Sequence, residues 1–448
     1  MNRGTETTES ACAAVGRESG GRRETRERRQ ALARVAIVAA AALCAGGGIA
    51  ACVPHGRRAP DLPAAGGSLA RAERHDHIDT LTREPMVAEH PGGALFVAGY
   101  NRHRPGLWKS VDGGATWARV DVGTESQGAV GNSDVDLAIA PDGALYFVSM
   151  TYDNAVHEGR QVAVGVSGDT GATWRWTTVS RTRFDDRPWV AVAPDGTAHL
   201  IWNDGRGVSH ARSSDGGRTW DRTGRIHDRG GSSHLAIGPR GEMAARVGPG
   251  AASGTQCDED TDLVAVSTDG GDSWRKYPAP GAPRPAGCDG HPDEIPRWVD
   301  PLAWDSTGAL YALWTDSIGV WLARSADMGA TWTPRRVVAR ADGEPVSYFP
   351  YLAARGRGML GATWLTGAAE GMRWRAAWIE GADGPSPHVR LSPPMPLESW
   401  RGDPPRADAG GEYLAARWLS DGSLAVVTPI QHESAGRLGF TLWTFGDR

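Results

Sequence analysis

One eight-residue pattern, Ser-x-Asp-x-Gly-x-Thr/Ser-Trp, occurs five times in this chain of 448 residues and constrains its fold more than any other feature. The copies occupy residues 110–117, 167–174, 213–220, 267–274 and 325–332. The Asp side chain can accept hydrogen bonds from nearby backbone N–H groups, and the Gly supplies a positive φ without steric cost, so the pattern closes a compact turn. The Trp is expected to cover the turn and pack between neighbouring sheets. We interpret each copy, an Asp box, as a hairpin connection that reports fold and not chemistry.

A second repeat consists of an apolar strand, a turn and another apolar strand. Its seven copies begin at residues 85, 137, 189, 235, 301, 351 and 413. Turns such as Pro141-Asp142-Gly143 between apolar runs indicate hairpins, and repeat periods of roughly 20–50 residues indicate propellers or arrays. The 60 Gly and 19 Trp, against only 6 Phe, suit short strands and tight turns. We expect an all-β fold, a β-propeller with Asp-box repeats, in which seven blades are favoured and six blades with an overlapping closure are the alternative.

The N-terminal segment has the features of an export signal. Arg-rich residues 17–29 precede an apolar run over residues 31–51, and Ile49-Ala50-Ala51-Cys52 resembles a bacterial lipobox, in which the cysteine is lipid-modified. An uncleaved membrane anchor is the alternative, because about 20 apolar residues can span a bilayer. Both Sec and twin-arginine export stay open, the latter because of Arg28-Arg29.

This segment sets the expected domain organisation. We expect residues 1–52 to be a lipoprotein export signal, residues 53–78 a tether, and residues 79–448 a single propeller domain. The protein would be lipid-anchored at the outer surface of a bacterial cell membrane, or secreted. Two cysteines remain in the body, and in an oxidising compartment Cys257 and Cys288 are expected to form a disulfide.

No cofactor is expected, and the charge argues against a nucleic-acid partner. The formal net charge is −5 and the body is more acidic than the Arg-rich N-terminus, whereas a nucleic-acid binder would carry a basic face. No second pair of soft ligands accompanies the body cysteines, so no metal site is predicted. The acidic run at residues 258–260 with Asp262 could hold calcium, but a solvated loop is the favoured interpretation.

The Asp boxes resemble those of the sialidase (neuraminidase) superfamily, over residues 83 to about 390. The resemblance implies a propeller that cleaves terminal sialic acids with three arginines on the sugar carboxylate, an Asp acid/base, and a Tyr nucleophile activated by a Glu. Arg83-Glu84-Pro85 stands where the family has Phe/Tyr-Arg-Ile-Pro, with Glu84 replacing the apolar residue. The family's acid falls between this motif and the first box, but no Asp occurs between Glu84 and Ser110.

The remaining members of such a site have candidates elsewhere in the chain. Glu294, Arg297 and a later Tyr follow the family's order of Glu, Arg and Tyr. The resemblance implies Arg83, Arg187 and Arg297 for the carboxylate, Tyr348 or Tyr351 as nucleophile, Glu294 as base, and Asp134, Asp136 or Asp186 in place of the missing acid.

Propeller geometry gives an independent argument for the same region. The residues just before the innermost strand of each blade converge on one mouth of the central channel. They are Arg83, Glu84, Asp134, Asp136, Asp186, Arg187, Ser233, His234, Arg297, Asp300, Tyr348 and Glu412. This ring could bind a sugar acid or a cation, or its members could satisfy one another. We therefore expect a monomer that binds or hydrolyses a glycan carrying sialic acid or a related sugar acid, Arg83, Glu84, Arg187, Arg297 and Asp300 being its ligand-binding residues. The alternative is a non-catalytic cell-surface scaffold.

Overall fold

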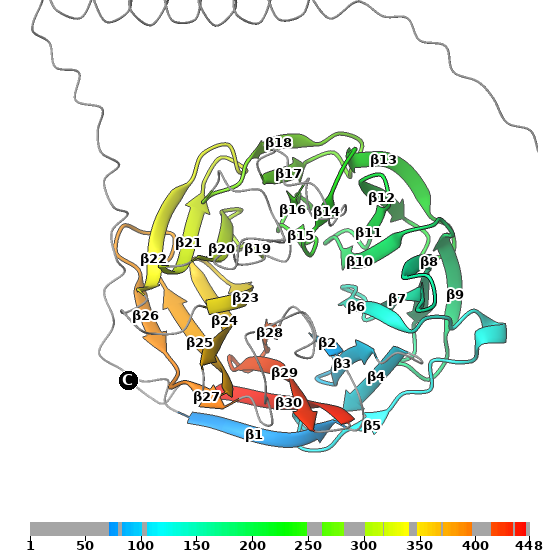
Figure 1. The fold of residues 1–448 in the computed structure, drawn as a ribbon, viewed down its shortest axis with the longest axis horizontal. Helices are drawn as coiled ribbons and strands as arrows, with labels where there is room; N and C mark the ends of the chain where they lie inside the picture. Colours follow the sequence, from blue (N-terminus) through cyan, green and yellow to red (C-terminus); the bar gives the residue numbers. More distant parts are fainter. Residues whose placement is uncertain are drawn as a thin grey trace, which may run out of the picture. The chain divides into compact units, whose positions relative to one another are not determined.

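The computed structural model describes ten segments of the chain. They are residues 71–78, 83–100, 105–248, 262–281, 301–316, 318–339, 347–368, 371–396, 414–432 and 435–444. Within these segments the elements are strands, together with one short 3-10 turn, η1 (Glu125–Gln127). The strands form seven separate antiparallel sheets that surround a central channel (Figure 1). The all-β propeller with seven blades is confirmed, and the six-bladed alternative is wrong.

Each blade is a meander whose first strand lies innermost. Blade 1 contains β2 (Arg83–Glu89), β3 (Leu95–Tyr100), β4 (Pro105–Ser110) and β5 (Ala118–Arg119). Blade 2 contains β6 (Ser133–Ile139), β7 (Leu145–Asp153), β8 (Glu158–Ser167) and β9 (Arg175–Ser180). Blade 3 contains β10 (Asp185–Val192), β11 (Ala198–Asp204), β12 (Val208–Ser213) and β13 (Asp221–His227). Blade 4 contains β14 (Gly231–Ser232), β15 (Ala236–Ile237), β16 (Met243–Gly248), β17 (Leu263–Ser267) and β18 (Arg275–Pro278).

The other three blades follow the same plan. Blade 5 contains β19 (Leu302–Trp304), β20 (Leu310–Asp316), β21 (Gly319–Ser325) and β22 (Thr333–Ala339). Blade 6 contains β23 (Ser347–Arg355), β24 (Met359–Ala368), β25 (Gly371–Glu380), β26 (His388–Leu391) and β27 (Met395–Pro396). Blade 7 contains β28 (Ala415–Trp418), β29 (Leu424–His432) and β30 (Ala435–Thr444), and its fourth strand is β1 (Arg71–Ile78).

The ring closes through β1, which pairs with β30 from Arg71 opposite Thr444 to Ile78 opposite Leu438. Residues 71–78 were expected to belong to a tether, and the structure instead places them in the sheet of blade 7. The misassignment has a physical cause. Middle strands such as β11 are buried along their whole length because blades pack on both faces, whereas fourth strands such as β13 are largely exposed. The sequence of β1, Arg-Ala-Glu-Arg-His-Asp-His-Ile, suits a polar outer strand and carries no apolar alternation.

The Asp boxes form the turns between third and fourth strands, as predicted. In the first box, Asp112 accepts hydrogen bonds from the Ser110 hydroxyl at 2.7 Å and from the Thr116 N–H at 2.8 Å. These bonds lower the pKa of Asp112 to about 2, the bond to the Thr116 side chain having the largest effect. Trp117 donates its indole N–H to the Gly114 carbonyl at 2.9 Å, and its ring packs edge-on against Phe440 of blade 7 at 5.1 Å. Each box thus closes a turn and helps to join adjacent blades.

The expected export signal and tether mostly precede the described segments, as does the expected lipidation site Cys52. Cys257 and Cys288, the expected disulfide, also lie outside the described residues. Among the described residues, no helix has the length and apolar character needed to cross a membrane.

Candidate functional site

The innermost strands share one register around the channel. In every blade, one residue of the innermost strand pairs with the residue eight positions further on, as Ala138 does with Tyr146 (146 − 138 = 8). We call this set the alanine level, which consists of Ala88, Ala138, Ala191, Ala236, Ala303, Ala353 and Arg417. The residues two positions earlier form a second set, the axial ring, which consists of Met86, Asp136, Trp189, His234, Pro301, Tyr351 and Ala415. The channel can therefore be described level by level.

Ahead of the axial ring lies the upper mouth, where the innermost strands begin. Its described charged side chains are Glu84 and Asp134, which are 7% and 9% exposed, and Asp186 and Arg187. The Arg187 Nε lies 3.5 Å from the Asp186 Oδ2. Burial raises the pKa of Tyr152, and the carboxylates of Asp186 and then Asp134 add to this effect. The carboxylates of Asp134 and Asp186, from two neighbouring blades, thus act on the same phenol.

Three blades begin with the same unusual backbone conformation. Glu84, Arg187 and Phe349 have φ values of 50°, 47° and 46°, and each is followed by a proline. A bulky residue with φ above zero is uncommon and costs of order 1–3 kcal/mol, and such residues cluster at functional sites. A register shift accompanies each of these starts, from Arg83 to Met86 in blade 1, for example. In the sequence, these three starts are Arg83-Glu84-Pro85, Asp186-Arg187-Pro188 and Tyr348-Phe349-Pro350. Only the first is predicted as a motif from the sequence alone.

The axial ring separates the upper mouth from the rest of the channel. The His234 ring lies over Trp189 with a centroid distance of 3.9 Å and contacts Tyr351 edge-on at 5.1 Å. These contacts connect blades 3, 4 and 6. Asp136 accepts the Leu137 N–H and the Val190 N–H, both at 2.8 Å, and so joins blades 2 and 3. Asp136 and His234, which were expected at the mouth, lie in this deeper layer together with Tyr351, a candidate nucleophile.

Burial sets the titration of the axial ring. It raises the pKa of Asp136 to about 7, against the effect of the two backbone N–H donors. It lowers the pKa of His234 to about 3, and the positive charge of Arg187 adds to this effect. It also raises the pKa of Tyr351, an effect strengthened by Asp136 and opposed by Arg417. At neutral pH the ring therefore holds a neutral imidazole, a neutral phenol and a carboxyl group that can give or take a proton.

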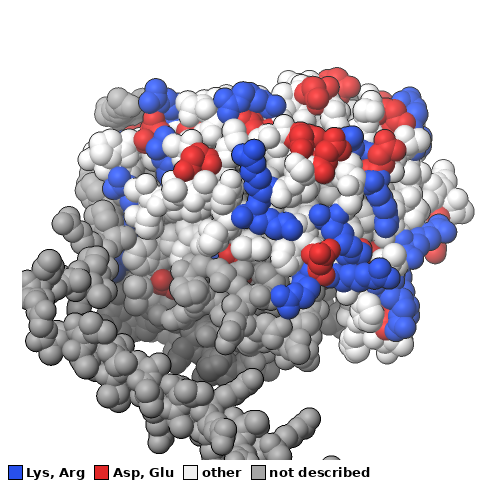
Figure 2. Space-filling view, turned by 90° about the horizontal axis from the view of Figure 1, so that it is seen from above, with Lys and Arg blue, Asp and Glu red and all other residues white. Residues whose placement is uncertain are grey.

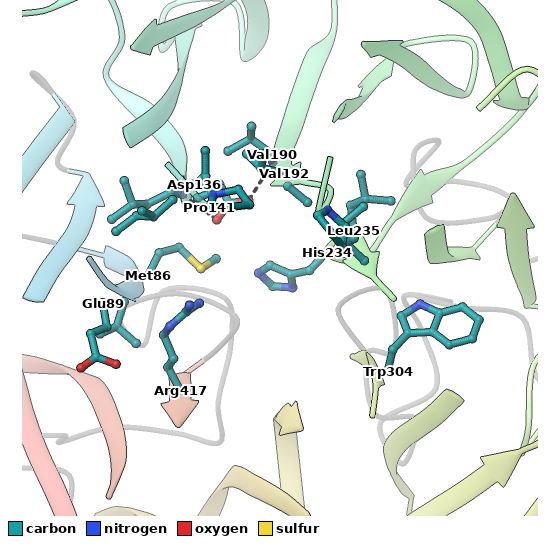
Figure 3. A pocket seen from close by; sticks show the side chains of 18 of the residues that line it. Met86, Glu89, Asp136, Pro141, Val190, Val192, His234, Leu235, Trp304 and Arg417 are labelled. Carbon is teal, nitrogen blue, oxygen red and sulfur yellow. Dashed lines mark hydrogen bonds between the residues drawn. The ribbon is translucent and has the colours of Figure 1, made fainter. Parts of the chain in front are cut away.

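Beyond the axial ring lies the axial cavity, with a volume of about 680 Å³ (Figure 3). All seven blades line it, and no lining residue precedes the axial ring in its strand. Pro91, Pro141, Pro194 and Pro239 show that it reaches the face where the inner hairpins turn, opposite the upper mouth. His234, Met86 and Arg417 point into it (Figure 3).

Several expected site residues lie outside the described segments. These are Glu294, Arg297, Asp300 and Glu412. The backbones of Arg83 and Tyr348 are described: Arg83 is the first residue of β2 and Tyr348 the second residue of β23, at the upper mouth.

The acidic residues for which a solvated loop was favoured over a calcium site are only partly described. Residues 258–260 lie outside the described segments, and Asp262 lies within them. Asp262 is fully buried and pairs with Arg246 at 2.8 Å, so its charge is balanced within the protein. No group of three or more potential metal ligands occurs in the part of the chain that the structure describes.

Arg417 and the role of Glu89 are not predicted by the sequence motifs. The Glu89 carboxylate accepts the backbone N–H and hydroxyl of Ser420 at 2.7 and 2.6 Å, which joins blade 1 to blade 7. Aligning the seven hairpins would have revealed Arg417 as the one departure from alanine at its level. That alignment needs the common register, which the motifs alone do not supply.

The fold defines the protein as a seven-bladed β-propeller with Asp boxes. No protein-family model matches the chain, and no curated protein matches it in sequence. A PL25 ulvan lyase bound to -[GlcA(1-4)Rha3S]- is similar at a TM-score of 0.50 and 12% identity, over 82% of this chain and 95% of that one. A GH93 α-L-arabinofuranosidase of Fusarium graminearum has a TM-score of 0.48 and 13% identity, over 81% and 92%. YCF48 from Cyanidioschyzon merolae has a TM-score of 0.48 and 12% identity, over 83% and 99%. At these identities the likeness concerns the fold alone.

Proposed function

We propose that this protein binds, at its upper mouth, a carbohydrate that carries a carboxylate, and that sialic acid or a related sugar acid is the ligand class. The observation that carries the proposal is the composition and backbone of the mouth. Glu84 and Arg187 are held in the same rare conformation in different blades, beside Asp134 and Asp186. A guanidinium group suits a sugar carboxylate because it can form two parallel hydrogen bonds. Carboxylates suit sugar hydroxyls, which donate hydrogen bonds to them.

The fold comparison supports the same ligand class. The ulvan lyase that resembles this chain was solved with -[GlcA(1-4)Rha3S]-, and the GlcA unit carries a carboxylate. We extend this ligand class to the present chain as part of the proposal. We also propose that the protein is exported and lipid-anchored through Cys52, because the segment that ends there has the order of an export signal.

Hydrolysis is the enzymatic form of this proposal. Of the two candidate nucleophiles, Tyr351 contacts His234 in the axial ring, whereas Tyr348 is the second residue of β23, near the mouth. Of the three candidate acids, Asp134 and Asp186 are at the mouth and Asp136 lines the cavity beyond the ring. The proposed hydrolase therefore uses Tyr348 as nucleophile, Asp134 or Asp186 as acid, and Glu294 as base.

The test is calorimetric titration of the full chain in detergent with sialic acid, glucuronic acid and neutral galactose. Arg187→Gln removes the mouth cation. The matched control, Arg206→Gln, removes an exposed arginine from the β11–β12 turn of the same blade. We expect acidic sugars to bind and galactose not to bind. We also expect only Arg187→Gln to weaken binding, by about tenfold or more, because a hydrogen-bonded charge contributes about 1.5–3 kcal/mol. Equal effects of the two variants, or no binding of any sugar acid, would refute the proposal.

A second assay distinguishes the enzyme from the scaffold. The scaffold alternative is favoured by the lack of an Asp between Glu84 and Ser110, where related enzymes carry their acid. Release of a fluorophore from aryl sialosides and aryl glucuronides, abolished by Tyr348→Phe, is the result expected of the hydrolase. Binding without turnover identifies a glycan-binding propeller, and neither binding nor turnover leaves the scaffold.

A further inference from the structure

The alanine level contains one large charged residue. Six blades place a methyl group there, and blade 7 places Arg417. Of the six alanines, Ala138 and Ala191 line the axial cavity. The Arg417 side chain is exposed to this space and projects into it (Figure 3). Arg417 is thus the charged residue at a level that is alanine in the other six blades.

No hydrogen bond or ion pair joins the Arg417 guanidinium to another residue in the described segments. Burial lowers the pKa of Arg417, and the charges of Tyr351 and then Glu89 oppose this effect. Glu89 is itself engaged, since both of its carboxylate oxygens accept hydrogen bonds from Ser420. A guanidinium group that has no such partner among the described residues, in a cavity of this size, favours an anionic ligand.

The walls of the cavity restrict which anion fits. Its lining side chains are mostly aliphatic, and they come from every innermost strand. They include Met86, Val87, Leu137, Ile139, Val190, Val192, Leu235, Ile237 and Trp304. Glu89, Asp136 and Asp305 also line the cavity. Their carboxylates would repel a doubly charged anion more strongly than a singly charged one, and a single guanidinium offers only one compensating charge. A monoanion with an apolar body satisfies both the wall and the charge.

We propose that the axial cavity is a second binding site, separate from the upper mouth, that takes a small organic carboxylate with an apolar body and holds its carboxylate on Arg417. The ligand enters from the face where the inner hairpins turn. The Trp189–His234–Tyr351 contacts of the axial ring lie between this ligand and the upper mouth. The site therefore does not depend on the proposed function at the mouth.

The titratable groups around the cavity predict how this binding responds to pH. They are Asp136 from blade 2, His234 from blade 4, Asp305 from blade 5, Tyr351 from blade 6, and Glu89 and Arg417 from blades 1 and 7. Asp136 is the group whose pKa lies near neutrality, at about 7. Its ionisation places a negative charge in the cavity, so carboxylate binding should weaken as the pH rises from 6 to 8.

The test uses the full chain in detergent and hexanoate as the carboxylate probe, with hexanamide as the neutral analogue and inorganic phosphate as the other anion. Binding is measured by calorimetry and by quenching of tryptophan fluorescence, because Trp304 lines the cavity. Arg417→Ala completes the set of seven alanines and so copies a residue that six blades already tolerate. Arg417→Met keeps the length of the side chain without its charge, which makes loss of packing distinguishable from loss of charge.

We expect hexanoate to bind and hexanamide to bind at least tenfold more weakly. Both Arg417 variants should weaken hexanoate binding at least tenfold, with an unchanged melting profile, while Arg187→Gln leaves it unchanged. Sugar-acid binding at the mouth should behave in the opposite way, so the two proposals fail separately. The cavity proposal is overturned if hexanoate does not bind, if either Arg417 variant binds it as well as the wild type, or if phosphate binds as tightly with the same dependence on Arg417.

Discussion

Two histidines buried in blade 3 should make the propeller sensitive to mild acid. His199 and His210 are 2% and 0% exposed, and their rings stack with His199 Nδ1 at 3.2 Å from His210 Nε2. The second ring nitrogen of His210 lies 2.5 Å from the Thr223 hydroxyl. Burial lowers the pKa of His199 to about 4 and that of His210 to about 3, the latter also because of His199 itself. Both imidazoles are therefore neutral in the folded protein at pH 5.

The magnitude follows from proton linkage. An unfolded histidine with a pKa of 6.5 binds a proton below that pH, while these two bind it only near pH 4 and below. Their contribution to stability is therefore complete above pH 6.5 and is lost as the pH falls. At pH 5 the solution is 1.5 pH units below the unfolded pKa, and each unit corresponds to about 1.4 kcal/mol. Each histidine therefore lowers the free energy of unfolding at pH 5 by about 2 kcal/mol. The pair together loses about 4 kcal/mol between pH 7.5 and pH 5.

Two other groups change in the same interval, so the wild type alone does not isolate the pair. His234, with a pKa of about 3, adds a loss of the same sign. Asp136 changes the stability in the opposite direction. With a pKa of about 7 it is protonated in the folded protein at pH 5, whereas in the unfolded protein it stays ionised at that pH, so acidification stabilises the folded state at this residue. The difference between wild type and a variant that lacks the pair removes both contributions.

The assay is urea unfolding at pH 7.5 and pH 5.0. The variant is His199→Gln with His210→Gln, which removes the titration but retains hydrogen-bonding side chains. The control is His388→Gln, at an exposed position of β26. We expect the double variant to lose about 4 kcal/mol less than the wild type on acidification, and the control to behave as the wild type does. Equal pH dependence in wild type and double variant, with unchanged urea slopes, would show that the imidazoles are not held neutral by burial.

Two further perturbations test the packing of blade 4. Arg246→Met should destabilise the protein by about 3–5 kcal/mol in urea unfolding, because it leaves buried Asp262 without its partner. The control Arg357→Met, at an arginine side chain that is 75% exposed, should cost about 1 kcal/mol or less. Comparable costs would contradict the assigned burial. Gly271→Ala should lower the thermal midpoint further than Gly113→Ala. Both glycines have a positive φ, but only alanine at position 271 would place its methyl group 2.0 Å from the His210 ring. Equal shifts in the thermal midpoint would show that the Asp-box turn relaxes freely.

The repeats predicted the fold because each turn carries its own chemistry. Asp112 and Thr116 lie close in sequence, so their hydrogen bonds are encoded locally and their recurrence counts blades. β1 carries no such local signal. Its pairing with β30 depends on a partner at the other end of the chain, and its polar sequence fits an outer strand as well as a linker.

Part of the candidate site could be predicted because the connectivity of a propeller is regular. The connection before each innermost strand leads to the mouth in any propeller, so Asp134, Asp186 and Arg187 could be assigned to it from sequence alone. The depth of Asp136 and Tyr351 could not, because a shift of two residues along a strand decides between the mouth and the axial ring. Arg417 stands out only when it is compared with the six alanines at the same level. That comparison requires the register of all seven innermost strands, which the structure supplies.

The pairing of β1 with β30 also sets the order in which the protein can become complete. The partners Arg71 and Thr444 are separated by 373 residues (444 − 71 = 373), so this contact is among the most distant in the sequence and among the slowest to form. During synthesis, β1 must wait for a partner strand that emerges more than 350 residues later. A chain truncated before β30 holds six potential blades with both ends of the array unpaired, and such edges are targets for aggregation and proteolysis. The closure therefore depends on synthesis reaching β30, since only then does β1 gain the strand with which it pairs.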